Sequence, residues 1–311
     1  MLILFCSITL FVLFIGLGYA AAKLVDNVKI ISLKLGAPLF VIGLVLGFFT
    51  SLPELSIGFN AVADGYFGLP IGNLYGGIIV MFCLILGLSA VLNKRISTDG
   101  HFRSVTPFIV FIMFALILGL KGRYGWYDGL LFCFIYLGLI YFTFRKNQRH
   151  LELQTPVLNQ KKVATEIFYV IAGAVAVIIL SDLIVRVTEL LLAQVNIRGL
   201  TLGLLVFSIG TNLPELSVAL TSWRKHAAEL SLSHLLGSAV CNMLIIGILS
   251  LFKTLYFPVD ASYYALIVLI GLSLFLFMRF YKTDKMLSRR EGLVLLGVYL
   301  LFVISQIVLL K

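Results

Sequence analysis

Residues 50–56 read Thr-Ser-Leu-Pro-Glu-Leu-Ser, and residues 211–217 read Thr-Asn-Leu-Pro-Glu-Leu-Ser, so six of seven positions recur 161 residues later. Both copies lie within apolar runs long enough to cross a bilayer. A glutamate in such a run loses its hydration, and the proline beside it frees the carbonyl four residues earlier. Glu54, Glu215 and the freed carbonyls are the oxygen ligands that Na⁺ and Ca²⁺ use. The repeated stretch therefore predicts a cation site within the membrane.

The composition is that of a protein embedded in a membrane. Of its 311 residues, 61% are hydrophobic and 12% are charged, and the mean hydropathy is +1.09. Soluble domains carry about 25% charged residues. The net charge of +10 does not indicate nucleic-acid binding, because the basic residues fall between the apolar runs and do not alternate with aromatic ones. The partners we expect are inorganic cations and the lipid bilayer, with no nucleic acid and no obligatory protein partner.

The apolar runs predict an all-α membrane protein of ten transmembrane helices, since about 20 apolar residues span the hydrocarbon core. The expected helices cover residues 1–22, 30–59, 67–92, 105–121, 126–145, 163–192, 198–222, 231–252, 260–281 and 291–310. The first lacks the basic start and the cleavage site of a signal peptide, so we expect it to remain as a membrane helix. The polar segment 146–162 separates a first five-helix repeat, residues 1–145, from a second, residues 163–311.

Charges beside the expected helices predict how the chain crosses the membrane. Eighteen of the 24 Lys and Arg residues lie in or beside the connections that follow helices 1, 3, 5, 7 and 9. The positive-inside rule places those connections, including the 146–162 linker, in the cytoplasm and both termini outside, in a plasma or inner membrane. Because five is an odd number, the second repeat is inserted upside down. Secondary transporters built from such inverted repeats bind their substrates near the midplane, where broken helices meet.

Helical spacing gathers other polar residues around each glutamate. Residues three, four and seven positions before an acid share its face of a helix. The candidate ligands on these two faces, besides Glu54 and Glu215, are Gly47, Thr50, Ser51, Ser208, Thr211 and Asn212. A single intramembrane glutamate can instead be a protonated acid bonded to a neighbouring helix. Two copies favour a functional role, because intramembrane acids are rare and mark ion pathways.

Further polar and small residues allow two interpretations. Gly76, Gly77 and the Gly237–Ser238 pair favour a tight helix packing seam over a ligand site. Asn242 lies one turn after Ser238 on the same face, and we favour it as a ligand. Asn73 and His234 occupy equivalent positions near expected helix starts, where we expect them to cap the helix or contact interfacial water.

The remaining ionisable and thiol groups have structural explanations. Asp182, Arg186 and Glu189 follow the i, i+4, i+7 spacing of an ion-pair ladder near a helix end. The four cysteines show neither a CxxC spacing nor a disulfide framework, so we expect them to act as small packing residues.

Three motifs carry a resemblance to a known family. The residues are Thr-Ser-Leu-Pro-Glu at 50–54, Gly-Thr-Asn-Leu-Pro-Glu at 210–215 and Gly-Ser-Ala-Val-Cys-Asn at 237–242. They resemble the two α-repeats of the calcium/cation antiporter superfamily, and the sodium/calcium exchanger branch is the most similar. The resemblance implies exchange of Na⁺, or of H⁺ or K⁺ in some branches, for Ca²⁺, without a cofactor. It also implies that helices 2, 3, 7 and 8 hold the ions while helices 1 and 6 slide across them.

The resemblance further implies ion-binding motifs at residues 47–81 and 208–242. The family's ligand positions fall on Gly47, Thr50, Ser51, Glu54, Ser208, Thr211, Asn212, Glu215, Ser238 and Asn242. Two departures stand out, because Gly77 and Met81 occupy positions where exchangers usually place polar residues, and the Met81 thioether is a poor ligand for a hard cation. Asn242 also stands where many members have aspartate. Two carboxylates balance one Ca²⁺, two Na⁺ or two H⁺, so we expect fewer bound ions and an electroneutral exchange.

Several functions remain open at this point. The leading prediction is a secondary-active antiporter that exchanges Ca²⁺, or another divalent cation, for Na⁺ by alternating access. The runner-up is a cation/H⁺ antiporter in which the same glutamates titrate. A passive channel and a protein that binds ions without moving them are further alternatives. We do not expect an enzyme, because no intramembrane nucleophile has a base close in sequence.

Overall fold

The computed structural model describes residues 2–34, 47–93, 95–97, 102–147, 163–193, 199–216, 219, 228–282 and 286–309. The helices of the first half are α1 (Leu2–Lys34), α3 (Leu52–Ala63), α4 (Gly68–Ile79), α5 (Leu86–Asn93), α6 (Phe102–Leu118) and α7 (Trp126–Asn147). Those of the second half are α8 (Val163–Leu192), α9 (Gly199–Leu202), α10 (Ser208–Thr211), α12 (Ala228–Phe252), α13 (Ala261–Lys282) and α14 (Arg289–Val308). The π-helical turns η1 (Val80–Ile85) and η5 (Gly203–Phe207) continue α4 and α9, and η2 (Gly119–Lys121) is a 3₁₀ turn.

The chain folds as an all-α membrane protein. Seven of the described spans are long and apolar enough to cross a bilayer, and the apolar helices Val105–Lys121 and Gly199–Thr211 are shorter. The prediction of a helix over residues 30–59 was wrong in its bounds. α1 continues to Lys34, and the later part divides into a helical turn at residues 47–50 and α3. Residues 35–46, between them, lie outside the described part.

Two helical regions form the buried centre of the molecule. The continuous span of α4, η1 and α5 is mostly buried, and so is α12, whereas α1 and α8 are mostly exposed. The hydropathy of these two regions is similar to that of α1 and α8, so helix packing and not composition places them at the centre. α4 packs against α9, η5 and α10, and α12 packs against α3, α6 and α7. The segments that carry the two repeated motifs therefore lie beside the two most buried helices.

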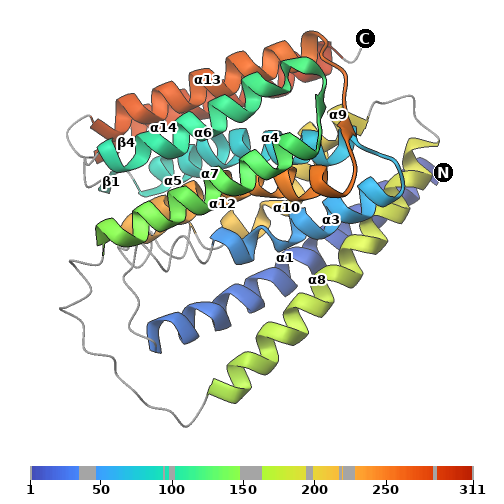
Figure 1. The fold of residues 1–311 in the computed structure, drawn as a ribbon, viewed down its shortest axis with the longest axis horizontal. Coiled ribbons are helices and arrows are strands. Elements are labelled where there is room, and N and C mark those ends of the chain that lie inside the picture. Colours follow the sequence, from blue (N-terminus) through green and yellow to red (C-terminus); the bar gives the residue numbers. More distant parts are fainter. Residues whose placement is uncertain are drawn as a thin grey trace.

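α1 and α8 form a pair at one side of the molecule, and α13 and α14 lie at the opposite side (Figure 1). The pair is joined to the centre by a separate apolar cluster that includes Phe14, Leu17, Ile57 and Phe207. A larger apolar cluster, the main core, fills the space around α4, α6, α12 and α13. α1 and α8 thus share one packing unit, distinct from the main core.

Two short strand pairs tie the halves together. β1 (Arg95–Ser97) pairs antiparallel with β4 (Met286–Ser288), and β2 (Arg123–Tyr124) pairs antiparallel with β3 (Leu255–Tyr256). β1 and β3 follow α5 and α12, whereas β2 and β4 lie after α6 and α13. Each half therefore contributes one strand to each pair, and the two pairs lie at opposite ends of α6.

A buried tyrosine cluster fixes α4 against the main core. The hydroxyls of Tyr75 and Tyr124 are hydrogen-bonded to each other. Tyr124 also donates to the Ala115 carbonyl over 2.7 Å, and Tyr263 donates to the Leu116 carbonyl over 2.9 Å. The cluster joins α4, α6, β2 and α13, one residue away from the carbonyl of Leu74 that the candidate site uses.

Candidate cation-binding site

Both repeated motifs break a helix at the same position. In the first copy Ser51 leaves helical geometry, with φ −84° and ψ 6°, and α3 begins at Leu52 with Pro53 in its first turn. In the second copy Asn212 has nearly the same angles, φ −85° and ψ 12°, and ends α10. Proline is tolerated in a first helical turn because that position needs no amide donor. The repeated proline therefore explains why both helices restart just before their glutamates.

The ten candidate ligands are all buried, and none points toward lipid. They are Gly47, Thr50, Ser51, Glu54, Ser208, Thr211, Asn212, Glu215, Ser238 and Asn242. Glu54 and Glu215 expose only 2% and 1% of their surface. Burying a carboxylate away from water is unfavourable. Proteins therefore retain one where it binds a cation or pairs with a charged group.

The two glutamates lie close enough for their charges to interact. The hydroxyl of Thr211, from the second motif, lies near the carboxyl of Glu54, from the first. The hydroxyls of Thr50 and Ser238 lie near the carboxyl of Glu215. Each acid therefore lies near the threonine of the other motif, so the two motifs meet at one place.

Each motif threonine contacts a buried residue on the other half. Thr211 Oγ1 donates to Asn73 Oδ1 over 3.0 Å, and Thr50 Oγ1 lies 3.1 Å from His234 Nε2. The prediction that Asn73 and His234 cap helices or contact interfacial water was wrong, because both are buried. α4 begins at Gly68 and α12 at Ala228, so these residues lie inside their helices. The sequence feature that pointed to their burial is their shared position, because Asn73 lies one turn before Gly77, and His234 one turn before Ser238, on the same helix face.

The Gly47 carbonyl is surrounded by hydroxyl groups. It accepts from Ser51 Oγ at 2.9 Å, from Thr50 Oγ1 at 3.2 Å and from Ser238 Oγ at 3.4 Å. Thr50 Oγ1 also lies 3.1 Å from Ser238 Oγ. A Cβ at position 47 would lie 2.6 Å from the backbone nitrogen of Ser238, so only glycine permits this approach. Hydroxyls can turn their protons away from an incoming cation, so this group of oxygens is suited to a hard ion.

The corresponding place in the other half is different. Ser208 has the position of Gly47, but its carbonyl accepts from the side-chain amide of Asn212 over 2.8 Å. The amide of Asn242 donates to the Leu74 carbonyl over 2.9 Å. A Cβ at Gly77 would lie 2.9 and 3.1 Å from these two amide nitrogens. Amide N–H groups are donors only, so they repel a cation, whereas Ser238 offers an oxygen beside Thr50 of the first motif.

Four buried side-chain oxygens at the centre have no hydrogen-bond partner. They are Glu54 Oε2, both carboxyl oxygens of Glu215 and Asn212 Oδ1. Buried polar groups in native proteins are almost always paired, so such oxygens require an explanation. A cation coordinated by two carboxylates, an amide oxygen and nearby hydroxyls would satisfy them, and oxygen ligands of this kind suit Ca²⁺ and Na⁺.

The other sequence predictions concern groups away from this site. Arg186 forms an ion pair with Asp182 over 2.8 Å at i,i+4 spacing, as predicted, and both side chains are exposed. The four cysteines are free, also as predicted. Met81 is buried in the main core. Residues 148–162, most of the expected linker, lie outside the described residues, and α7 extends to Asn147.

The chain matches a known protein family over most of its length. Residues 6–145 and 165–308 match the family described as sodium/calcium exchanger protein. The chain belongs to this family. As a member it is a membrane-embedded cation antiporter, which agrees with the expectation of transport and not enzymatic catalysis.

Individual relatives of this exchanger-family chain cover nearly its whole length. An uncharacterized membrane protein of Methanocaldococcus jannaschii is 27% identical over 86% of both chains. The sodium/calcium exchanger MaX1 of Methanosarcina acetivorans is 24% identical over 96% of this chain and 98% of its own. Among solved structures, the sodium-calcium exchanger NCX_Mj in Na⁺ and Sr²⁺ has a TM-score of 0.72 at 22% identity, covering 98% of this chain and 99% of that chain. At that identity the structural likeness establishes the fold.

Proposed function

We propose that the chain exchanges Ca²⁺, or another divalent cation, for Na⁺, with Glu54 and Glu215 as the central ligands. The observation that carries the proposal is the set of unpartnered carboxyl oxygens of these two residues, which are buried and near enough for their charges to interact. The other ligands we propose are Gly47, Thr50, Ser51, Ser208, Thr211, Asn212, Ser238 and Asn242. No cofactor takes part, and the ions are substrates.

Charge balance couples the two ions. Without an ion, two buried carboxylates repel each other, so a conformational change that keeps them bare is unfavourable. One divalent or two monovalent cations neutralise the charge of −2 and allow the site to pass from one side of the membrane to the other. Exchange follows because neither a bare nor a half-filled site crosses readily.

We propose an architecture of ten helices in two inverted repeats, residues 1–145 and 163–311. The segment 146–162 is then a cytoplasmic linker, and both termini lie outside. The matched helix breaks at Ser51 and Asn212 support it. So do the reciprocal strand pairs: the strand after α5 pairs with the strand after α13, and the strand after α6 pairs with the strand after α12. Inverted repeats give a site near the midplane that either side can reach.

We propose that α1 and α8 move together across the site. They pack along each other, and α1 meets the second motif through small residues. Phe14 lies against Gly210, and a Cβ at Gly18 would lie 3.0 Å from Cβ of Leu213. The glycines at these contacts let the helices approach closely, and closely packed helices can shift along each other in a shear motion.

The proposal predicts fewer bound ions than a site with more carboxylates would hold. Only Glu54 and Glu215 carry charge, and the amides of Asn212 and Asn242 face Gly77, where a hydroxyl would otherwise add a ligand. We therefore propose an electroneutral exchange of one divalent cation for two Na⁺. A cation/H⁺ antiporter is the second candidate, because two carboxyl groups that share a buried site can also exchange protons.

Proteoliposomes that contain a Ca²⁺-sensitive dye test the proposal. An outward Na⁺ gradient should drive Ca²⁺ uptake by the wild type, and Glu54→Gln and Glu215→Gln should each abolish it. Glu189→Gln, on α8 and outside the site, is the matched control and should retain uptake. Uptake driven by a pH gradient without Na⁺ would favour the proton antiporter. Unchanged Na⁺-driven uptake in both site variants would refute the ligand assignment.

A further inference from the structure

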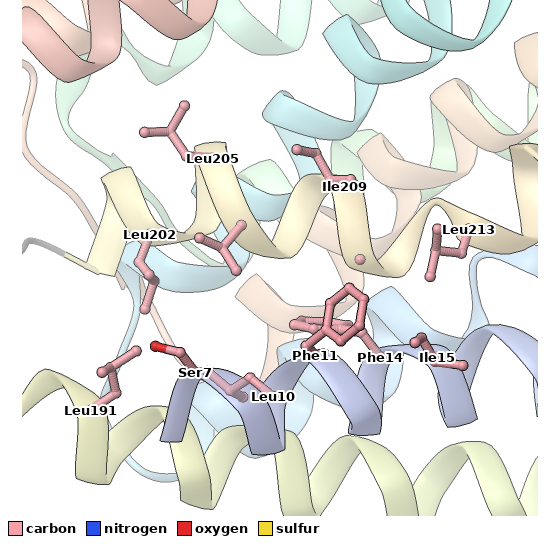
Figure 2. Close-up of a pocket in the computed structure, with 12 residues that line it drawn as sticks. Ser7, Leu10, Phe11, Phe14, Ile15, Leu191, Leu202, Leu205, Ile209 and Leu213 are labelled. Atoms are coloured by element: carbon pink, nitrogen blue, oxygen red, sulfur yellow. The ribbon is translucent and has the colours of Figure 1, made fainter. Parts of the chain in front are cut away.

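A cavity of about 440 Å³ lies between α1 and the α9–η5–α10 segment (Figure 2). Leu10 and Phe14 of α1 line one side, and Leu202 and Leu213 line the other. The volume falls within the range of about 300–1,000 Å³ typical of ligand sites. It lies outside the cation site but shares a wall with it, because Gly210, which lines the cavity, directly precedes Thr211.

The chemistry of the lining excludes water and charged ligands. Ser7, at one end, is the single residue of the lining with a polar side chain. A buried water needs two to four polar partners, which this lining does not offer. An empty space of this size would forfeit the dispersion contacts that close packing provides. The occupant that fits is therefore an apolar chain.

The open side of the cavity faces the hydrocarbon of the membrane. Phe11 and Ile15 expose 67% and 51% of their surface, and Val206 and Ile209 expose 40% and 39%. In a membrane protein these apolar side chains meet lipid tails. The cavity also has a matching length. Eight residues separate Ser7 from Ile15, a rise of about 12 Å, and half of the hydrocarbon core is about 15 Å thick.

We propose that a lipid acyl chain occupies this cavity, with its headgroup end beside Ser7 and its tail beside Gly210 and Leu213. The lipid comes from the leaflet that meets the N-terminal end of α1. The chain fills the gap between the α1–α8 pair and the segment that leads into the second motif. This binding does not depend on the proposed ion exchange, so either can fail without the other.

Photolabelling of the full chain in liposomes tests the proposal. The probe is phosphatidylcholine with a diazirine in its acyl chain, and labelled residues are mapped by mass spectrometry. We expect label on Leu10 and Leu202, which line the cavity and expose only 3% and 6% of their surface. Phe134 and Val268, exposed on α7 and α13, should be labelled in any case and serve as the positive control. Label on those two surface residues alone would overturn the proposal.

A pair of leucine substitutions separates cavity filling from a general effect. Leu202→Trp places an indole in the cavity and should reduce label on Leu10 by about tenfold, the ratio that a loss of about 1.4 kcal/mol in chain binding gives. Leu137→Trp makes the same change on the exposed face of α7 and should leave the labelling of Leu10 unchanged. If Leu202→Trp does not fold, Leu202→Phe is the smaller filling variant. Equal labelling of Leu10 in a folded filling variant and in the control would contradict the inference.

Discussion

The hydroxyl of Thr50 lies 3.1 Å from Nε2 of His234, a residue 184 positions later in the chain. The corresponding threonine of the second motif, Thr211, donates to Asn73 over 3.0 Å. The same contact is thus made twice, once with an imidazole and once with an amide. Because a hydroxyl has one proton, its partner determines where its lone pairs point, and the proposed ligands depend on that direction.

His234→Asn should keep transport close to the wild-type level, because the amide can repeat the contact that Asn73 makes. His234→Leu leaves the Thr50 hydroxyl without this partner. A hydrogen bond contributes about 1 kcal/mol, so the apparent affinity for the bound cation should fall about fivefold. The measurement is the KM for Ca²⁺ and Na⁺ in proteoliposomes, with Asn73→Leu as the matched change in the other half. Equal KM values in the Asn and Leu variants would contradict a positioning role for His234.

Gly47→Ala should destabilise the protein. The added Cβ would lie 2.6 Å from the Ser238 nitrogen and 2.8 Å from the Gly237 carbonyl carbon, and backbone atoms yield little. Overpacking of this kind costs about 1–3 kcal/mol. The check is the midpoint of thermal unfolding in detergent. Gly138→Ala, on α7, is the control, because nothing lies within 4 Å of its added Cβ, and alanine favours helix by up to about 1 kcal/mol. A midpoint that falls in Gly138→Ala but not in Gly47→Ala would contradict the observed packing.

Tyr124→Phe should lower stability more than a tyrosine change at the surface. It removes the donor to the Ala115 carbonyl and the hydroxyl that pairs with Tyr75. A buried polar group left without a partner costs about 1–3 kcal/mol. Thermal unfolding of the variant is compared with that of Tyr141→Phe, whose side chain on α7 is exposed. Similar midpoints for the two variants would show that the tyrosine cluster does not fix α4.

Asn242→Asp should change the charge carried in each transport cycle. It adds a third carboxylate and removes the amide that donates to Leu74. If the wild type exchanges one divalent cation for two Na⁺, its rate should not respond to membrane potential. The variant should respond, because a third carboxylate allows three Na⁺ to bind, and their exchange for one divalent cation moves one net positive charge per cycle. Potassium diffusion potentials set with valinomycin in proteoliposomes provide the test. A wild type that is already strongly sensitive to potential would exclude electroneutral exchange.

Much of the site could be predicted from the repeated motif. Duplication identified Glu54 and Glu215, and each adjacent proline indicated a helix break, because a proline fits the first turn of a helix and not its interior. The contacts of Asn73 and His234 could not be predicted in this way. They form between helices whose motifs are far apart in sequence, and the crossing of α4 with α10 is set by packing. The amides that face Gly77 were missed for the same reason, since spacing along one helix does not give the orientation of a side chain on another.

The central claim is that Glu54 and Glu215 hold one cation between them. The most direct test is X-ray diffraction at the strontium absorption edge from crystals soaked in Sr²⁺, a Ca²⁺ analogue with a strong anomalous signal. The account predicts one anomalous peak between the carboxyl groups of Glu54 and Glu215, lost in Glu215→Gln. A peak that lies away from both carboxyl groups, or no peak between them in well-diffracting soaked crystals, would contradict it.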